Sequence, residues 1–345
     1  MLVHGGFLLP RRIFVIIYHM QEKIITVENL KKDFSFAIKK ESGFFSNLLH
    51  PEVKIVKAVD DISFSVDRGE ILAFIGPNGA GKSTTIKILT GILYPSSGVV
   101  RVAGSNPQLE RKKLAFEIGT VFGQRSQLIF NLPLRDSFEL FGRMYELSSK
   151  QIHDKGRDLV DLFEMNSFSD QPVRKLSLGQ RMRAEIALSL LHSPKIVFLD
   201  EPTIGLDVVA KKKLREILLR LNKDFQTTIF LTSHDAGDIE ALCKRTIIIN
   251  HGKVVIDAET ASVSKEYITE KYIRLVLTKD VPSVEIPGVT VVNHEDAVLE
   301  LKIDTTKHSI QDILKIITNK FEIEDITVKD PPLEEIISFI YERRQ

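Results

Sequence analysis

The feature that most constrains this sequence is a glycine-rich segment between an apolar run and a helical pattern. The apolar run, Ile71–Ile75, is continuous, as expected of a strand buried on both faces. After the segment, apolar residues recur at helical spacing from Ile86 to Ile92. The segment reads Gly76-Pro77-Asn78-Gly79-Ala80-Gly81-Lys82-Ser83-Thr84 and fits the pattern G-x-x-x-x-G-K-[ST]. Strand, glycine loop and helix in this order are the context that a phosphate-binding loop requires.

The residue types in this loop suit a nucleotide triphosphate. Glycines let the backbone curl so that successive N–H groups point at a phosphate, and the following helix adds its positive N-terminal end. Lys82 would place its charge on the β- and γ-phosphates, and Ser83 would ligate Mg²⁺. The structural alternative is a glycine turn with an incidental lysine, which the flanking strand and helix disfavour. All residues from Gly76 to Thr84 are therefore candidates for binding a nucleotide.

A second candidate element is an apolar run that ends in two carboxylates. Ile196–Leu199 precedes Asp200 and Glu201, the pattern of a strand that delivers acidic groups to the edge of a sheet. Asp200 would hold Mg²⁺ through water, and Glu201 would polarise an attacking water. Taken alone, such a run is more often a solvated strand end with two surface acids. Together with the phosphate loop, it indicates a site that hydrolyses nucleotides.

Strand-like and helical patterns alternate along most of the chain, which favours an α/β fold with a mainly parallel sheet. The region from about residue 125 to 178 is mostly helical and indicates a helical subdomain. Predicted helices are Leu134–Leu147, Gln151–Phe163, Gly179–Leu191, Ala210–Leu221 and Asp235–Cys243, and further predicted strands are Ile24–Val27, Ile62–Val66, Thr228–Leu231 and Thr246–Ile249.

From about residue 265 the pattern changes to alternating apolar residues, then a helical stretch around Ile313, and, after Pro331-Pro332, a second one at the C-terminus. This predicts a small α+β domain of order β-β-α-β-α at residues 265–345, after a first domain at residues 21–260. Residues 1–20 are interpreted as a tail or an over-extended N-terminus with Met20 as the natural start, although Ile13–Tyr18 after two arginines has some likeness to a signal peptide.

Composition excludes several classes of protein. The 47 basic and 46 acidic residues give a net charge of +1, so no large basic surface for nucleic acid is expected. The single cysteine, Cys243, excludes an internal disulfide framework and a multi-cysteine zinc site, and its place on an apolar helix face predicts core packing. No run approaches the roughly 20 apolar residues that span a bilayer.

Further motifs, in order along the chain, give a resemblance to the ATP-binding cassette (ABC) ATPases, the P-loop NTPases that drive ABC transporters. Residues 176–180, Leu-Ser-Leu-Gly-Gln, are similar to the signature motif LSGGQ, and residues 205–207, Gly-Leu-Asp, to the D-loop. Gln124 matches the Q-loop glutamine, His234 the switch histidine, and Phe34 the aromatic residue that stacks on adenine, with Phe36 as the competing choice. The resemblance covers residues 21–255, and Leu178 departs from it at a position that is usually glycine.

The resemblance implies a composite ATP site formed by two chains, either a homodimer or a pair with a similar ATPase subunit. Gln124 would sense the γ-phosphate, contact the Mg²⁺ and position the water; Glu201 would activate that water; and His234 would support the transferring phosphate. From the other chain, the resemblance implies nucleotide contacts by Ser177, Gly179, Gln180 and Asp207. With Leu178 present, the site is expected to work with an altered closing equilibrium.

The resemblance also implies an integral membrane permease as partner and a peripheral location at the cytoplasmic face of the cell membrane. Residues 132–138 are the candidate contact surface, and residues 123–128 with the insert Ala37–Val56 resemble ATPases paired with ABC-2-type exporter permeases. The insert is interpreted as a covering loop or, alternatively, as an amphipathic contact with permease or membrane. For the C-terminal domain, dimer support or regulation is a hypothesis by analogy.

Three alternatives remain at this point. The first is a soluble ABC ATPase in a non-transport role such as translation or DNA repair. The second is an unrelated P-loop kinase or GTPase, which would not need a signature motif or His234. The third is a degenerate regulatory cassette, against which the intact Lys82, Asp200 and Glu201 argue.

Overall fold

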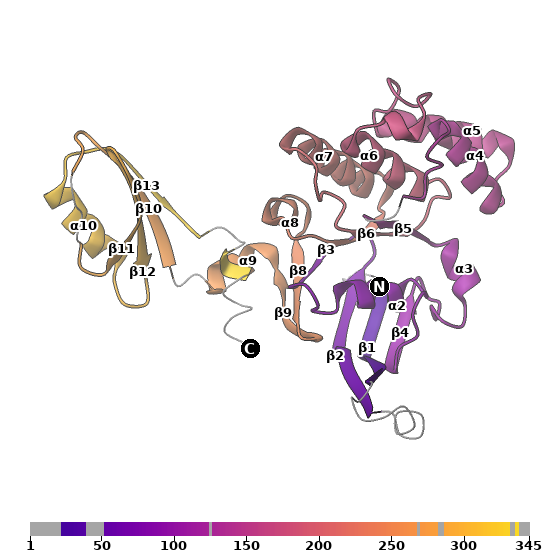
Figure 1. The fold of residues 1–345 in the computed structure, drawn as a ribbon, viewed down its shortest axis with the longest axis horizontal. Helices are drawn as coiled ribbons and strands as arrows, with labels where there is room; N and C mark the ends of the chain where they lie inside the picture. Colours follow the sequence, from indigo (N-terminus) through magenta and orange to yellow (C-terminus); the bar gives the residue numbers. More distant parts are fainter. Residues whose placement is uncertain are drawn as a thin grey trace, which may run out of the picture.

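The computed structural model describes residues 22–38, 52–123, 126–267, 270–281, 286–331 and 335–337 (Figure 1). Four predictions lie outside these residues or mostly so: the tail at residues 1–20, the middle of the insert before the phosphate loop, Gln124, and the helix after Pro331-Pro332, of which residues 335–337 are described. The flanks of the insert are the ends of two long strands, β1 (Lys23–Ile38) and β2 (Glu52–Asp67). None of the helices in the described ranges combines the length and the hydropathy that crossing a bilayer requires.

A six-stranded sheet forms the centre of the N-terminal domain, the described residues from 22 to 267. Its strand order is β5-β6-β7-β3-β8-β9, and all neighbouring pairs are parallel except β8 with β9. β3 and β7 are buried along their whole length, as expected for strands covered on both faces. The strands are β3 (Ile71–Ile75), β5 (Ile118–Phe122), β6 (Ile196–Asp200), β7 (Thr228–Thr232), β8 (Arg245–Asn250) and β9 (Lys253–Glu259). The prediction of a mainly parallel α/β sheet is confirmed.

A second, antiparallel sheet packs beneath the first, in the order β2-β1-β4, with β4 at Ser97–Val102 (Figure 1). Helix α2 (Lys82–Leu89) follows the phosphate loop and contributes Ile86, Ile88 and Leu89 to the core between the sheets. The short runs predicted at Ile24–Val27 and Ile62–Val66 are only parts of β1 and β2. They extend further because each continues into a long two-stranded ladder with the other.

The other helices of the N-terminal domain mostly cover the opposite face of the central sheet (Figure 1). They are α3 (Arg111–Ala115), α4 (Leu134–Met144), α5 (Ser149–Leu162), the 3₁₀ turn Val173–Lys175, α6 (Leu178–Ser189), α7 (Val208–Phe225), α8 (Ala236–Leu242) and α9 (Thr260–Tyr267). These bounds agree with the predicted helices to within a few residues. Helix α5 starts two residues before the predicted Gln151 because Ser148 and Gln151 form a capping box. Cys243 is buried, as predicted.

The C-terminal domain, residues 270–331, contains a four-stranded antiparallel sheet of order β11-β12-β10-β13, with α10 (Ile310–Lys320) packed on one face. The strands are β10 (Glu270–Leu277), β11 (Val289–Glu295), β12 (Val298–Asp304) and β13 (Ile323–Lys329). Three strands precede the helix, so the predicted order of two strands before it was wrong. The chain then returns to the N-terminal domain, where the helical residue Ile336 is buried in that domain's apolar core.

Candidate functional site: a phosphate-binding cleft

The glycine loop between β3 and α2 has the backbone that the sequence predicts. Gly79 and Gly81 have φ angles of 83° and 106°, in the left-handed region that favours glycine. A Cβ on Gly76 would lie 2.3 Å from the backbone oxygen of Ile249, so only glycine fits this close approach to β8. The loop therefore depends on its glycines both for its curvature and for its contact with the sheet.

Lys82 is buried in this loop, with 6% of its surface exposed. Its Nζ donates a 2.6 Å hydrogen bond to the oxygen of Gly76 and a 3.2 Å bond to that of Pro77. Burial lowers the pKa of the Lys82 ammonium, while the nearby Glu201 and Asp200 carboxylates act in the opposite direction. The ammonium is thus held by the loop and faces two carboxylates, a position from which it can bind phosphate oxygens.

The carboxyl end of β6 brings Asp200 beside the phosphate loop. Ser83 Oγ donates to Asp200 Oδ2 at 3.3 Å, and Thr232 Oγ1 at the end of β7 donates to Asp200 Oδ1 at 2.6 Å. Asp200 is thus fixed by one strand neighbour and by the start of α2. A hydroxyl and a carboxylate oxygen side by side are hard ligands of the kind Mg²⁺ prefers, so the residues present fit this ion.

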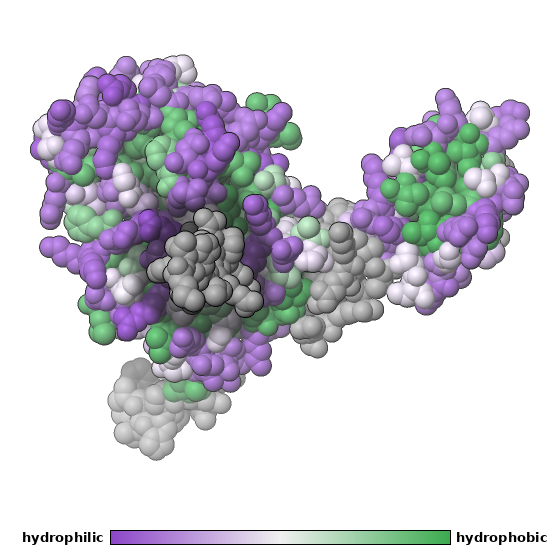
Figure 2. Space-filling view, turned by 180° about the vertical axis from the view of Figure 1, so that it is seen from behind, coloured by the Kyte–Doolittle hydropathy of each residue, from purple (hydrophilic) through white to green (hydrophobic). Residues whose placement is uncertain are grey.

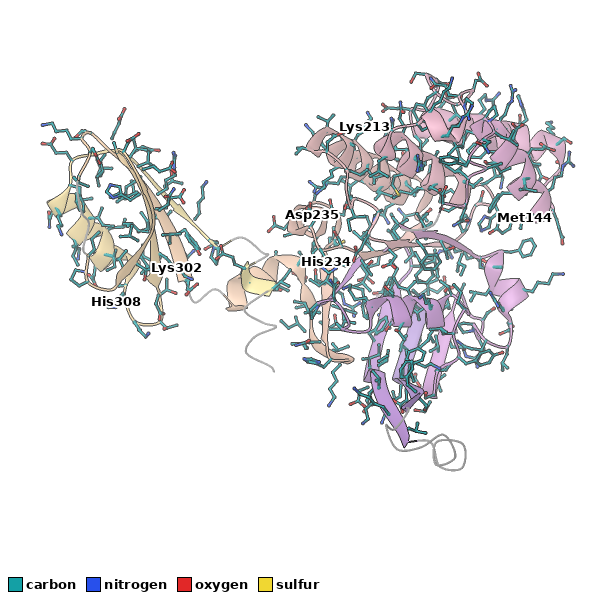
Figure 3. All side chains as sticks on the ribbon, viewed as in Figure 1. Met144, Lys213, His234, Asp235, Lys302 and His308 are labelled. Carbon is teal, nitrogen blue, oxygen red and sulfur yellow. The ribbon has the colours of Figure 1, made fainter. Side chains whose placement is uncertain are left out.

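Glu201 and His234 lie beside Asp200, just after the carboxyl ends of β6 and β7. His234 Nε2 lies 2.8 Å from Glu201 Oε1 and 3.4 Å from Lys82 Nζ. Glu201 has a φ of 55°, a left-handed conformation that is unusual for a residue other than glycine. The Glu201 N–H donates to both the backbone oxygen and the hydroxyl of Thr232, at 3.1 Å each, which holds this conformation in place. Figure 3 labels His234 and Asp235, which lie just before α8.

These groups line one cleft of about 1030 Å³. Its lining includes Pro77, Asn78, Gly79, Gly81, Lys82, Ser83 and Thr84 of the loop together with Phe34, Ala58, Lys87, Ile92, Leu93, Phe122, Gly123, Asp200, Glu201, Ile204 and His234. Phe34 lines the cleft, whereas Phe36 is not among the lining residues and is 55% exposed. Of the two aromatic candidates, the structure therefore places Phe34 where a base bound next to the phosphate loop could stack on it.

The signature and D-loop residues are not brought to this cleft within one chain. Ser177 and Gln180 instead form a capping box at the start of α6, through Ser177 Oγ with Gln180 N–H and Gln180 Oε1 with Ser177 N–H. Gly179 lies against α7, since a Cβ there would meet that of Ala210 at 2.9 Å. Asp207 caps α7 by accepting from the N–H of Ala210 at 2.8 Å.

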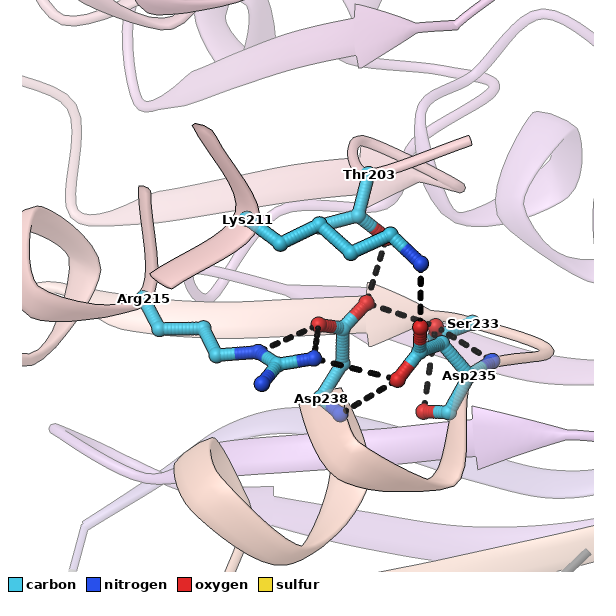
Figure 4. A network of polar contacts seen from close by, with 6 residues as sticks. All are labelled: Thr203, Lys211, Arg215, Ser233, Asp235 and Asp238. Carbon is cyan, nitrogen blue, oxygen red and sulfur yellow. Dashed lines mark hydrogen bonds and ion pairs between the residues drawn. The ribbon is translucent and has the colours of Figure 1, made fainter. Parts of the chain in front are cut away.

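A polar network behind the cleft was not predicted from the sequence (Figure 4). Asp238 of α8 is fully buried and accepts hydrogen bonds from Thr203, Ser233 and Arg215. Thr203 belongs to the turn after Glu201, and Ser233 precedes His234. The network therefore fixes the Glu201 turn and the His234 segment to each other, and Arg215 of α7 supplies the balancing charge. The only signal in the sequence is an acidic residue on the apolar face of α8.

A second unpredicted group is Glu185, a buried carboxylate on α6. It accepts hydrogen bonds from the Ser126 hydroxyl and the Gln127 N–H, and burial raises the pKa of its carboxyl despite these bonds. Ser126 and Gln127 come two and three residues after Gln124 in the sequence. Glu185 thus joins the helix that starts at the signature motif to the segment that follows Gln124.

A glycine loop with a buried lysine, next to an acidic strand end with a carboxylate–histidine pair, defines a P-loop nucleotide-hydrolysing enzyme. The family described as ABC transporter matches residues 59–204, and that described as ATP-binding protein DrrA1-3-like, C-terminal domain, matches residues 260–339. The chain is 35% identical over 202 residues to the ABC transporter ATP-binding protein NatA of Bacillus subtilis, covering 59% of this chain and 82% of NatA.

Two further comparisons agree. The daunorubicin/doxorubicin resistance ATP-binding protein DrrA of Streptomyces peucetius is 29% identical over 293 residues, covering 81% of this chain and 86% of DrrA. Among solved structures, cbiO1 from Clostridium perfringens, part of the ABC transporter complex cbiONQ, has a TM-score of 0.60 at 26% identity, covering 71% of this chain and 92% of cbiO1. The chain belongs to the family of ABC transporter ATP-binding proteins, and it is an ATP-binding, ATP-hydrolysing subunit. The transporter names of these relatives favour this role over the soluble, non-transport alternative.

Proposed function

We propose that this chain is the ATPase of an ABC exporter and that it works in pairs at the cytoplasmic face of the membrane, bound to a separate permease. The observation that carries the catalytic part is the meeting of Lys82, Glu201 and His234 within hydrogen-bonding range at the mouth of the phosphate loop. Export is supported by relatives such as a bacitracin transport protein of Bacillus licheniformis and a Nod factor export protein of Sinorhizobium fredii, which are 33% and 34% identical.

In the proposed mechanism, each group at the cleft has a distinct role. Lys82 binds the β- and γ-phosphates, and the loop N–H groups surround them. Glu201 accepts the proton of the attacking water, and its position is fixed by His234 on one side and Thr232 on the other. Ser83 and Asp200, together with Gln124 as the resemblance implies, would hold Mg²⁺, which would neutralise phosphate charge. The products are ADP and inorganic phosphate.

The second chain supplies the other wall of each site in this proposal. Ser177, Gly179, Gln180 and Asp207 lie outside the cleft lining and close to the surface, where a second copy can approach them. Each chain carries one phosphate loop and one signature segment, so two chains complete two sites. A solved bacterial ABC transporter cassette described as dimeric has a TM-score of 0.56 at 26% identity.

For the permease we propose a contact at residues 132–138. Leu132 is exposed, and a groove of about 270 Å³ between α4 and α5 adjoins it, lined by apolar and charged residues such as Leu134, Phe138 and Arg157. Such a mixed apolar groove suits a short helix of a membrane partner. Recovery of an integral membrane protein with the native chain, lost on substitution in this groove, is the corresponding test.

We also propose the domain division at residues 21–260 and 265–345, with the helical subdomain at about 125–178. It is supported by a separate apolar core, since Leu275, Leu301 and Ile317 belong to a cluster confined to the C-terminal domain, whereas Ile336 packs into the core of the N-terminal domain. Independent cores are the usual mark of domains.

The substitution Glu201→Gln tests the catalytic proposal. It keeps the size and hydrogen-bonding capacity of the side chain but removes the proton acceptor, so the ATPase rate should fall by about 100-fold or more. ATP binding should be retained, and the variant should accumulate as an ATP-bound dimer in sedimentation velocity. Glu240→Gln, at an exposed carboxylate of α8, is the matched control. Hydrolysis at the wild-type rate in Glu201→Gln would remove this residue from the mechanism.

A further inference from the structure

The sheet of the C-terminal domain has two edges that differ in regularity. At one edge, β11 carries a bulge between Val291 and Asn293, in the middle of its ladder with β12. At the other edge, β13 pairs with β10 without interruption from Asp325 to Lys329. A bulge protects an edge strand against pairing with another chain, whereas a regular edge presents its unpaired backbone groups. Among the described strands β13 has only β10 as a neighbour, so its outer side is available.

The regular edge also exposes apolar side chains. Ile326 and Val328 lie opposite Leu275 and Ile273 in the ladder, and both of these are buried in the core. Directly opposed residues face the same side of a sheet. Ile326 and Val328 therefore face the core side, yet they remain 38% and 42% exposed. Figure 2 shows apolar residues gathered on the face of this domain seen from behind.

The sequence of β13 is complementary to itself in one antiparallel register. We consider the registers in which both copies of α10 lie on the same face of the joined sheet. In these registers the two-fold axis passes through a residue position, so that this residue lies opposite its own copy. A shift of the register by one residue would place the two copies of α10 on opposite faces. With the axis at Thr327, Asp325 lies opposite Lys329 of the second copy, and Ile326 lies opposite Val328. An axis at Asp325 would instead oppose two aspartates, and an axis at Ile326 would pair no charges.

Two further observations favour this register. Within the part of the chain that the structure describes, the side chains of Asp325 and Lys329 form no hydrogen bond or ion pair, so both charges are available to a second copy. The one unfavourable opposition, Glu324 with Asp330, is moderated because Lys271 already forms an ion pair with Asp330.

We propose that β13 pairs with β13 of a second copy of this chain, in the antiparallel register centred on Thr327. The joined sheet has eight strands and places two Asp325–Lys329 pairs on one face and two Ile326–Val328 pairs on the other. Its two-fold symmetry is of the kind that most homodimers adopt. The contact needs no nucleotide, so it goes beyond the proposed function: it holds two ATPase domains at high effective concentration while their ATP sites are open.

A charge exchange in the full-length protein, measured without nucleotide, tests this interface. Sedimentation velocity of the wild type should show a concentration-dependent dimer. Asp325→Lys places lysine opposite Lys329, which should raise the dimer dissociation constant about tenfold. Adding Lys329→Asp reverses both charges and should restore the wild-type constant. Glu295→Lys, the same change of charge on the bulged edge strand, is the control and should have no effect.

Crosslinking tests the register independently. Thr327→Cys brings two thiols together at the axis, and the native Cys243 is buried, so oxidation should give a covalent dimer. Thr290→Cys on β11 should give no covalent dimer. A wild type that stays monomeric without nucleotide, a double charge exchange that fails to restore pairing, or equal crosslinking at the two edges would each overturn the proposal. Unchanged ATP binding by the variants shows that the ATPase domain is intact whichever result is found.

Discussion

The partly buried His192 gives a quantitative prediction for the pH dependence of stability. Its ring stacks on Tyr145 at 3.8 Å with an interplanar angle of 5°, and Phe116 meets Tyr145 edge-on at 5.7 Å. His192 Nε2 lies 3.0 Å from the backbone oxygen of Ile118, to which it donates in the neutral form. Nδ1 is buried and has no hydrogen-bond partner in the described part of the chain. Protonation would therefore place a donor on a buried nitrogen without an acceptor, and a charge at a poorly solvated position that the nearby Glu117 only partly offsets.

Burial lowers the pKa of His192 to about 4, from an ordinary value of 6.5. The unfolded chain takes up this proton before the folded one does, so the stability contributed by neutral His192 is complete above pH 6.5 and is lost as the pH falls from there toward 4. By linkage, the loss between about pH 7.5 and about pH 5 amounts to about 2 kcal/mol of unfolding free energy.

Urea unfolding of the wild type and of His192→Phe at these two pH values measures the difference. Phenylalanine keeps the stack on Tyr145 but cannot titrate, so its loss of stability on acidification should be smaller by about 2 kcal/mol. The other titrating groups are common to both proteins and cancel in the comparison. His153→Phe, at an exposed position of α5, is the control and should lose as much as the wild type. An equal loss in His192→Phe and in the wild type would refute the reasoning.

Three further substitutions test the site. Lys82→Ala removes the buried ammonium that faces the phosphates and should weaken ATP binding at least tenfold by calorimetry; unchanged affinity would contradict its role. Leu178 is 46% exposed beside Gly205, so Leu178→Gly should raise the dissociation constant of the ATP-bound dimer about fivefold in the Glu201→Gln background, by loss of apolar burial on closure. Asp238→Asn should lower the unfolding free energy by about 3 kcal/mol because Arg215 loses its buried partner, and combination with Arg215→Gln should be less than additive; additive losses would show that the two residues act independently.

The parts of the site that were predictable are those encoded locally. The phosphate loop, its strand and its helix are continuous in sequence, and the glycines at positions 79 and 81 carry a backbone requirement that no other residue meets easily. The approximate bounds of the helices could likewise be predicted from the spacing of apolar residues and from capping residues such as Ser148.

What could not be predicted depends on contacts between distant residues. β1 pairs with β4 as well as with β2, and nothing in the short run Ile24–Val27 indicates a three-stranded antiparallel sheet. Asp238 meets Thr203 only after β7 and α8 have folded against β6, so no local pattern reports this pairing. Phe34 and Phe36 lie on the same face of β1, two residues apart, so the choice between them likewise depended on how far along the strand the cleft extends.

Ile336 comes after the whole C-terminal domain in sequence, yet only 3% of it is exposed, in the same apolar cluster as Leu242 and Val263. During translation, the ATPase domain therefore leaves the ribosome with a gap in its interior that is filled only after the following domain has been synthesised. The core of the ATPase domain is therefore completed only after the C-terminal domain has been synthesised. Truncation of the chain before Ile336 would leave an otherwise intact ATPase domain with an exposed apolar surface, which chaperones and proteases would recognise.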